Sequence, residues 1–194
     1  HCEAKAFIVQ SGKDPEDGKE FPWIEQVNGM KKNLKTVEHY INFAVDSPSY
    51  DGFINYEQML AKASPAEPDV EVTPDDTWVI MYTGGTTGLP KGVMKSHANL
   101  FSQYFIMIYD HEFNYDDTIL LVMPCCHVNS LFYSFVVTWV GGTVMCYNMV
   151  SFNPESLIKC FSDHGITFTS LVPTHYIMML ALPDEVKAKY NLNA

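Results

Sequence analysis

Positive charge is scarce in this sequence. Twelve basic residues stand against twenty-three acidic ones among 194 residues, and the formal net charge at pH 7 is -11. A chain with this balance repels phosphate-rich polymers and anionic lipid surfaces, which excludes non-specific binding to nucleic acid or membranes as a main function. Any phosphate that the protein binds must therefore be held by a local group of donors.

Signatures of zinc sites and of serine hydrolases are also missing, because neither C-x-x-C nor H-E-x-x-H spacing occurs and no G-x-S-x-G elbow is present. The five cysteines are odd in number, which favours reduced, buried thiols in a cytoplasmic protein. Cys125 and Cys126 precede His127, but adjacent cysteines rarely point at one ion, and no second cluster of ligands accompanies them. We therefore expect neither a metal site nor a thiol nucleophile at this position.

The N-terminal sequence lacks an initiator methionine, a basic region and a cleavage site, so no targeting segment is expected. Asp, Glu, Lys and Arg are all absent from residues 118–154, a stretch long enough to cross a bilayer. Pro124, His127 and the pair Gly141–Gly142 interrupt it, which fits a buried strand, helix and strand better than one membrane helix. We expect no transmembrane segment.

The order of the segments predicts an α/β fold with a largely parallel β-sheet and helices on both faces. We expect an N-terminal α/β portion at 1–63, an acidic, proline-rich connector at 64–77 and a second α/β portion at 78–194. Strands are expected at 4–10, 37–46, 77–83, 93–97, 118–124, 143–148 and 166–173. Helices are expected at 54–63, 97–110, 130–140, 154–165 and 174–182, with an amphipathic stretch at 24–34. Ser96 and Asn153 are the expected caps of two helices, with Pro154 at the first position of the second.

A glycine- and threonine-rich loop follows the expected strand at 77–83, in the stretch "YTGGTTGLPKG". Glycines, hydroxyls and a lysine together typically bring backbone N–H groups and a cation to phosphate. A Walker loop needs glycine before its lysine and Ser or Thr after it, whereas Lys91 lies between Pro90 and Gly92. A dinucleotide fingerprint would need glycine where Thr83 stands. Both of these common phosphate loops are therefore excluded.

The stretch resembles instead the phosphate loop of the adenylate-forming superfamily, which includes acyl-CoA synthetases, aryl-CoA ligases, beetle luciferases and peptide-synthetase adenylation domains. Its pattern there is Tyr-Thr-Ser/Thr/Gly-Gly-Thr-Thr-Gly-x-Pro-Lys-Gly, and this chain matches every fixed position. The resemblance implies that ATP phosphates are bound by Thr83, Gly84, Gly85, Thr86, Thr87, Gly88 and Lys91. It also places Thr83 near Mg²⁺. Serine is frequent in the family at the position of Gly84. Glycine here removes one hydroxyl and keeps the backbone donors, so we expect a modest change in phosphate binding and no loss of the loop's function.

A second motif, Pro124-Cys125-Cys126-His127, resembles the Pro-x-x-His turn whose histidine flanks the carboxylate and acyl pocket in the superfamily. We therefore assign His127 to that pocket, although a histidine satisfied in the core is the plain alternative. Asn129 and Ser130 depart from patterns common in the family, which leaves the substrate open. The residues 172–174 resemble a turn of acyl-CoA synthetases. For residues 176–179 we expect core packing, because an apolar stripe at helical spacing needs no ligand.

The resemblance implies an acyl-CoA synthetase, most simply one for fatty acids, that joins a carboxylate to CoA through an acyl adenylate and uses ATP and Mg²⁺. It covers only the middle of the family's large N-terminal domain, so no catalytic residue can be assigned, and we expect this chain alone to be a partial, inactive domain. An aryl-CoA ligase, another adenylation domain and an inert nucleotide-binding module remain as alternatives. The implied partners are a small carboxylate, ATP and CoA, in the cytoplasm, and the oligomeric state stays open.

Overall fold

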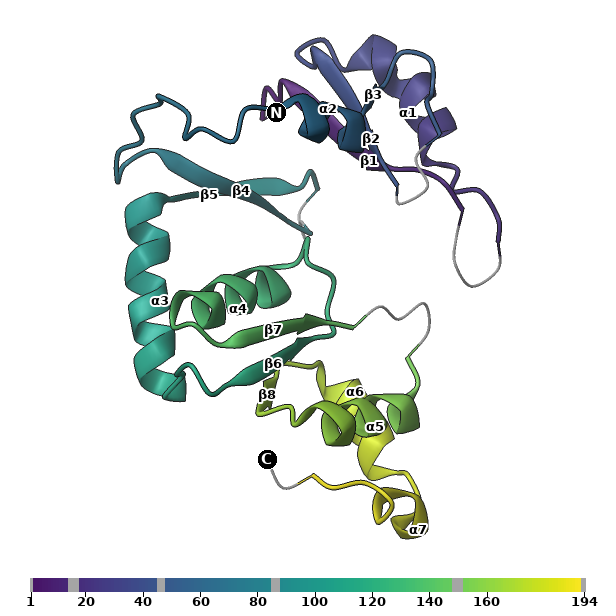
Figure 1. The fold of residues 1–194 in the computed structure, drawn as a ribbon, viewed down its shortest axis with the longest axis vertical. Coiled ribbons are helices and arrows are strands. Elements are labelled where there is room, and N and C mark those ends of the chain that lie inside the picture. Colours follow the sequence, from purple (N-terminus) through teal and green to yellow (C-terminus); the bar gives the residue numbers. More distant parts are fainter. Residues whose placement is uncertain (1, 14–17, 45–47, 85–87, 148–151, 193–194) are drawn as a thin grey trace. The chain divides into compact units, whose positions relative to one another are not determined.

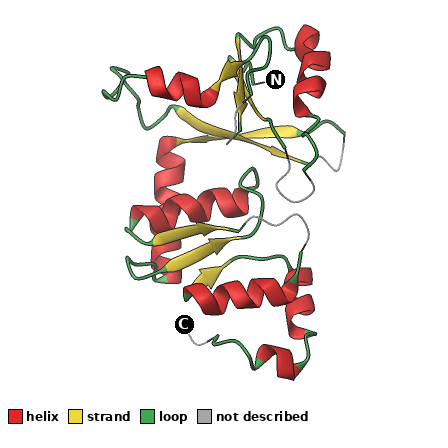
Figure 2. Ribbon diagram, turned by 45° about the vertical axis from the view of Figure 1, so that its right-hand side comes forward, coloured by secondary structure: helices red, strands yellow, loops and turns green. Residues whose placement is uncertain are grey.

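The computed structural model describes residues 2–13, 18–44, 48–84, 88–147 and 152–192 of the chain. The chain divides into two compact units, residues 1–71 and 72–194. The division falls within the acidic segment at 64–77. Figure 1 labels the helices and strands, and Figure 2 colours them by type.

The first unit is a small parallel sheet with helices. Strands β1 (Ala6–Gln10), β2 (His39–Phe43) and β3 (Ile54–Asn55) pair in that order, all parallel. Helix α1 (Trp23–Met30) leads into a 3-10 turn, η1 (Lys31–Asn33), and α2 (Tyr56–Lys62) begins directly after β3. The side chain of Asn55 caps α2 by accepting from the N–H of Gln58. Because β3 takes the first two residues of the expected helix at 54–63, that helix is shorter than predicted.

The second unit carries both motifs singled out in the sequence. It contains the strands β4 (Thr77–Thr83), β5 (Lys91–Ser96), β6 (Thr118–Leu121), β7 (Thr143–Cys146) and β8 (Phe168–Thr169). Its helices are α3 (His97–His111), α4 (Val128–Trp139), α5 (Pro154–His164), α6 (Pro173–Leu180) and α7 (Asp184–Lys187). Strands β7, β6 and β8 form a parallel sheet in that order.

Strand β6 lies in the middle of this sheet and buries side chains on both faces. Ile119 and Leu121 pack in one core with side chains of α3 and α4, among them Leu100, Tyr104, Phe132 and Val136. Leu120 packs in a second core with side chains of α5 and α6, among them Leu157, Ile158 and Met179. Successive side chains of a strand point to opposite faces, so three consecutive apolar residues serve two cores. The expected α/β fold with helices on both faces of a parallel sheet is confirmed.

Pairing of β4 with β5 departs from the parallel pattern. These strands form a separate antiparallel pair, so the described strands make three sheets instead of one continuous parallel sheet. The physical reason is the length of the connection, since parallel neighbours need a long crossover and the short segment 84–90 permits only a hairpin.

The segment without charged residues, 118–154, contains β6, α4 and β7 in its described part, as the sequence predicted. Burial is greatest in β6, where Ile119, Leu120 and Leu121 are all buried, and in the part of α4 that faces the core, which includes Phe132, Val136 and Val137. Among the residues that the structure describes, none of the helices combines the length and hydrophobicity that a bilayer crossing requires.

Helix boundaries follow the capping residues closely. Ser96 accepts from the N–H of Asn99, whose side chain accepts from the N–H of Ser96 in return, so a capping box starts α3. Asn153 caps α5 by accepting from the N–H of Ser156, with Pro154 at the first helical position. Both predicted caps are confirmed.

Two expectations near the C-terminal end are wrong in extent. The expected strand at 166–173 shrinks to β8, because only Phe168 and Thr169 find partners on β6 and Pro173 already begins α6. On α6 the expected core packing holds for Met179, which is 8% exposed, whereas Tyr176, Ile177 and Met178 are exposed. In the described part of the chain, Met179 is the position of α6 that enters a core, together with Leu157 and Ile158 of α5.

Replacement of Ser96 by alanine should lower the free energy of unfolding by about 1 kcal/mol, because it removes the N-cap of the longest helix. Ser102→Ala is the matched control on the same helix, since this exposed hydroxyl only bonds back to the carbonyl of Ala98. The control should be neutral or slightly stabilising. Urea denaturation followed by circular dichroism measures both, and equal losses for the two variants would contradict the assigned cap.

Candidate functional site

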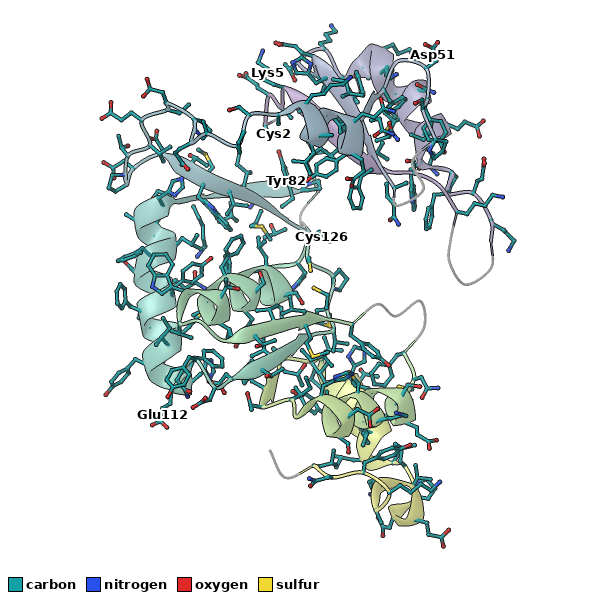
Figure 3. The ribbon with its side chains drawn as sticks, in the orientation of Figure 1. Cys2, Lys5, Asp51, Tyr82, Glu112 and Cys126 are labelled. Atoms are coloured by element: carbon teal, nitrogen blue, oxygen red, sulfur yellow. The ribbon has the colours of Figure 1, made fainter. Side chains whose placement is uncertain are left out.

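The glycine loop is carried by the hairpin of β4 and β5. Tyr82 pairs with Gly92 and Thr83 with Lys91 in the antiparallel register, so the chain leaves and re-enters the hairpin at neighbouring positions. Figure 3 labels Tyr82 near this end of β4. The hairpin thus presents the loop between two paired strand ends.

Thr83 and Lys91 stand directly opposite one another at the mouth of the loop. The hydroxyl of Thr83 donates to the backbone carbonyl of Lys91 over 3.4 Å, a long hydrogen bond that leaves the hydroxyl oxygen's lone pairs to accept or coordinate. Both residues are exposed. The sequence contains no arginine, so lysine is the only strong cation this chain can offer to phosphate.

The second lysine of β5 is engaged differently. The Nζ of Lys95 donates to Oε1 of Gln103 over 2.8 Å and lies 5.3 Å from the centre of the Phe132 ring. Lys95 is therefore tied to α3 and α4, while Lys91 lies at the mouth of the loop.

Each described glycine of the hairpin has its own physical role. Gly88 has φ +131°, a conformation that L side chains rarely adopt. A Cβ on Gly92 would lie 2.9 Å from a methyl group of Ile80, so this position needs the close approach that only glycine allows. Gly84 faces open space, with nothing within 4 Å of a Cβ built there. A serine at this position, as the family often has, would fit without strain.

Three of the predicted phosphate ligands, Gly85, Thr86 and Thr87, lie outside the described residues. The structure places Thr83, Gly84, Gly88 and Lys91 together at one end of the hairpin.

His127 lies in a turn at the carboxyl end of β6, directly before α4. Its N–H donates to the carbonyl of Pro124 over 2.9 Å, which closes the predicted Pro-x-x-His turn. Its Nδ1 accepts from the backbone N–H of Asn129 over 3.2 Å, so the ring caps α4. Because Nδ1 accepts, the neutral ring carries its proton on Nε2, which is left as a donor. His127 is exposed, unlike a histidine buried in the core, and the bond from the N–H of Asn129 fixes the orientation of its ring.

Asn129 and Ser130 hold this turn in place. In the sequence they were noted only as departures from patterns common in the family. The amide of Asn129 donates to the hydroxyl of Ser170 over 2.6 Å, joining the turn after β6 to the segment after β8. Ser130 is 1% exposed, and its hydroxyl donates to the carbonyl of Met123 over 2.6 Å. Sequence reasoning missed Ser170, because no local spacing signals a contact across forty-one positions.

The turns after β6 and β8 meet at one edge because the strands are parallel. In open α/β sheets, ligands typically bind at the carboxyl ends of the strands. His127, Asn129 and Ser170 occupy that edge, where the Nε2–H of His127 is a donor that can orient an oxygen-rich ligand.

The described residues offer little to a metal ion by themselves. Within the described ranges, no group of three or more His, Cys, Asp or Glu side chains could hold a metal. The hydroxyl of Thr83 is a hard oxygen that suits Mg²⁺, yet it supplies a single position. These residues therefore fit Mg²⁺ only as part of a Mg–nucleotide complex in which phosphate oxygens provide further ligands.

Gly92→Ala should lower the free energy of unfolding by about 1–3 kcal/mol, because the added methyl group overlaps the side chain of Ile80. Gly84→Ala at the other end of the loop is the matched control, with an expected change within about 0.5 kcal/mol. Thermal unfolding and urea denaturation report both values. Equal tolerance of the two substitutions would contradict the close approach at Gly92.

Ser130→Ala should cost about 1–3 kcal/mol of folding free energy, because it leaves the carbonyl of Met123 without its buried donor. Ser134 on the same helix provides the comparison. Its hydroxyl donates to the carbonyl of Leu131, and that carbonyl also accepts a backbone N–H within the helix, so it keeps a donor when the hydroxyl is removed. Ser134→Ala should cost clearly less in the same denaturation experiment. A Ser130→Ala protein as stable as the parent would show that the turn does not depend on this bond.

Comparisons with known proteins identify the family of this chain. The sequence model of the family described as AMP-binding enzyme matches residues 1–193. A long-chain-fatty-acid–CoA ligase of Thermus thermophilus is 32% identical over 188 residues, 94% of this chain and 32% of the relative. An indoleacetate–CoA ligase of Aromatoleum aromaticum is 34% identical over 162 residues, 83% of this chain and 31% of the relative. This chain thus spans about a third of the length of these curated relatives.

Solved structures share the fold. The inhibitor-bound N-terminal domain of FACL13 from Mycobacterium tuberculosis gives a TM-score of 0.77 at 25% identity, covering 98% of this chain and 43% of that one. An anthranilate CoA ligase, AuaEII, in complex with anthranoyl-AMP gives a TM-score of 0.79 at 17% identity, covering 98% of this chain and 35% of that one. With the family match over nearly its whole length, the chain belongs to the AMP-binding enzymes, the adenylate-forming family that its glycine loop resembles.

Proposed function

We propose that this chain forms the phosphate- and carboxylate-binding part of an ATP-dependent acyl-CoA synthetase. The reaction joins a fatty acid or related carboxylate to CoA and releases AMP and pyrophosphate, with an acyl adenylate as intermediate. The observation that carries the proposal is the β4–β5 hairpin, which places Thr83 and Lys91 opposite one another at the mouth of the glycine loop.

The loop's task in this proposal is to hold the β- and γ-phosphates of ATP. Backbone N–H groups and hydroxyls of residues 83–88 donate to the phosphate oxygens, and Lys91 adds a point charge. The carboxylate oxygen attacks the α-phosphorus, and the bond from that phosphorus to the bridging oxygen breaks. The same donors then stabilise the charge that develops on departing pyrophosphate.

Magnesium, when it is bound with the nucleotide near Thr83, neutralises phosphate charge. The residues of this chain supply the donors around it. The open side of Gly84 leaves the loop free of side-chain bulk at that position, so the backbone donors can approach the phosphates closely.

His127 contributes at the carboxylate. Its Nε2–H is left as a donor by the bond that Nδ1 accepts from Asn129, and it lies at the carboxyl end of β6. A donor at this place orients the carboxylate and lines the entrance of the acyl pocket. In the second half of the reaction the CoA thiol attacks the acyl carbon, and AMP leaves.

We place the protein in the cytoplasm, where reduced thiols persist, since all five cysteines are free. The fatty-acid assignment follows the Thermus thermophilus relative, named a long-chain-fatty-acid–CoA ligase. An aryl-CoA ligase is the second candidate, because a relative of similar identity is named an indoleacetate–CoA ligase.

Lys91→Ala should weaken binding of Mg-ATP by about 10- to 100-fold, the loss expected for one charge-assisted hydrogen bond. Lys95→Ala, on the same strand, is the matched control and should keep the affinity, because Lys95 is engaged with Gln103. Isothermal titration of this chain measures both. An equal loss of affinity in the two variants would contradict the role of Lys91. If the parent chain shows no binding of Mg-ATP, an inert structural module is favoured.

Acyl-CoA formation by the full-length protein distinguishes the substrate candidates. We expect long-chain fatty acids to give the highest kcat/KM in a panel of short, medium, long-chain and aromatic acids. A preference for aromatic acids would overturn the fatty-acid assignment in favour of an aryl-CoA ligase. Liquid chromatography of the CoA thioesters measures the product of each reaction. A reaction without any added acid is the control.

A further inference from the structure

Two hydrogen bonds meet on Asn129, one made by its backbone and one by its side chain. The backbone N–H donates to Nδ1 of His127 over 3.2 Å, and the side-chain amide donates to the hydroxyl of Ser170 over 2.6 Å. His127 is the N-cap of α4, so Asn129 lies in the first turn of that helix. Figure 3 labels Cys126, which directly precedes His127 in the chain. The residue that orients the imidazole is thus itself held by Ser170.

Ser170 is well anchored because β8 ends directly before it. Thr169, the last residue of β8, pairs with Leu120 of β6, and its hydroxyl donates to the carbonyl of Leu120 over 2.8 Å. Leu120 is buried in a hydrophobic core. The central strand of the sheet therefore fixes the backbone that leads to Ser170.

The bond to Ser170 keeps the amide of Asn129 away from the end of the helix. Asparagine side chains compete for the free N–H groups of a first helical turn when nothing else engages them. The N–H of Asn129 is one of these groups, and Nδ1 of His127 accepts from it. Once the hydroxyl of Ser170 is removed, the amide can turn back toward the helix end. The imidazole then loses the fixed orientation and the fixed place of its proton.

We propose that Ser170 is a positioning residue for His127 and acts through Asn129. Ser170 holds the Asn129 side chain, the N–H of Asn129 stays with Nδ1, and the proton of the neutral ring stays on Nε2. For the reaction, this role rests on the function proposed above, in which the Nε2–H orients the carboxylate. A residue after β8 thereby sets the geometry of a donor in the turn after β6.

Ser130 supports the same turn in a different way. Its hydroxyl donates to a backbone carbonyl, that of Met123, and so stabilises the path of the chain. The hydroxyl of Ser170 instead accepts from the side chain of Asn129. Loss of the Ser130 hydroxyl therefore appears in the free energy of unfolding, whereas loss of the Ser170 hydroxyl appears in the state of the His127 ring.

Nuclear magnetic resonance of the histidine rings tests this role without any measurement of activity. The chain is labelled with ¹⁵N in its seven histidines, and His127→Gln assigns the signals of His127. At about pH 8.5, where an ordinary imidazole is neutral, the parent should show the tautomer with its proton on Nε2. Ser170→Ala should shift the two ring nitrogens toward the average of both tautomers. Ser170→Thr, which keeps the hydroxyl, should restore the parent signals.

Two further variants separate positioning from a general loss of structure. Ser162→Ala is the matched control, since the hydroxyl of Ser162 also accepts one N–H, from Asn191 over 3.0 Å, and it should leave the His127 signals unchanged. In an Asn129→Ala background, Ser170→Ala should add no further change, because the side chain through which it acts is absent. Unchanged His127 signals in Ser170→Ala, or an equal change in the Asn129→Ala background, would overturn the positioning role.

Steady-state kinetics of the full-length protein measure the consequence for the substrate. Ser170→Ala should raise the KM for the carboxylate by about 3- to 10-fold, the range of one neutral hydrogen bond, and leave kcat and the KM for ATP unchanged. Altered ring signals with an unchanged KM for the carboxylate would support the positioning role and overturn the carboxylate role of His127 instead. A similar rise in both KM values would show a merely structural effect and overturn the proposal.

Discussion

Burial of β6 on both of its faces is the constraint on which the larger unit depends. Ile119 and Leu121 fill one core, Leu120 fills the other, and these residues are 1%, 6% and 2% exposed. Moving the strand by one position would exchange the two sets of side chains between the cores, so its register is fixed. The fixed register in turn sets where the strand ends, and with it the position of the turn that carries Cys125, Cys126 and His127.

The two parts of the candidate site are held by different contacts. The described ends of the glycine loop are joined by the pairing of Thr83 with Lys91. The turn at His127 is held along its length by the capping bond to Asn129, by Ser130 and by Ser170. In the proposed reaction, the loop holds the leaving group and the donor at His127 orients the carboxylate.

Local sequence patterns predicted the features that depend on neighbouring residues. The strand at 77–83, the caps Ser96 and Asn153, and the strand, helix and strand within 118–154 are all specified by residues close in sequence. The exclusion of two common phosphate loops likewise needed only Pro90 and Thr83. Features that depend on distant residues were missed or misjudged. The bond from Asn129 to Ser170, the short β8 and the exposed face of α6 follow from which elements meet in three dimensions, and no spacing along the chain encodes that.

The central proposal is that this family member activates a carboxylate with ATP. Exchange of labelled pyrophosphate into ATP by the full-length protein measures that half-reaction alone, without CoA. We expect exchange that depends on an added carboxylate and disappears when the acid is omitted. Absence of exchange with every aliphatic and aromatic acid, in a protein that still binds Mg-ATP, would contradict it.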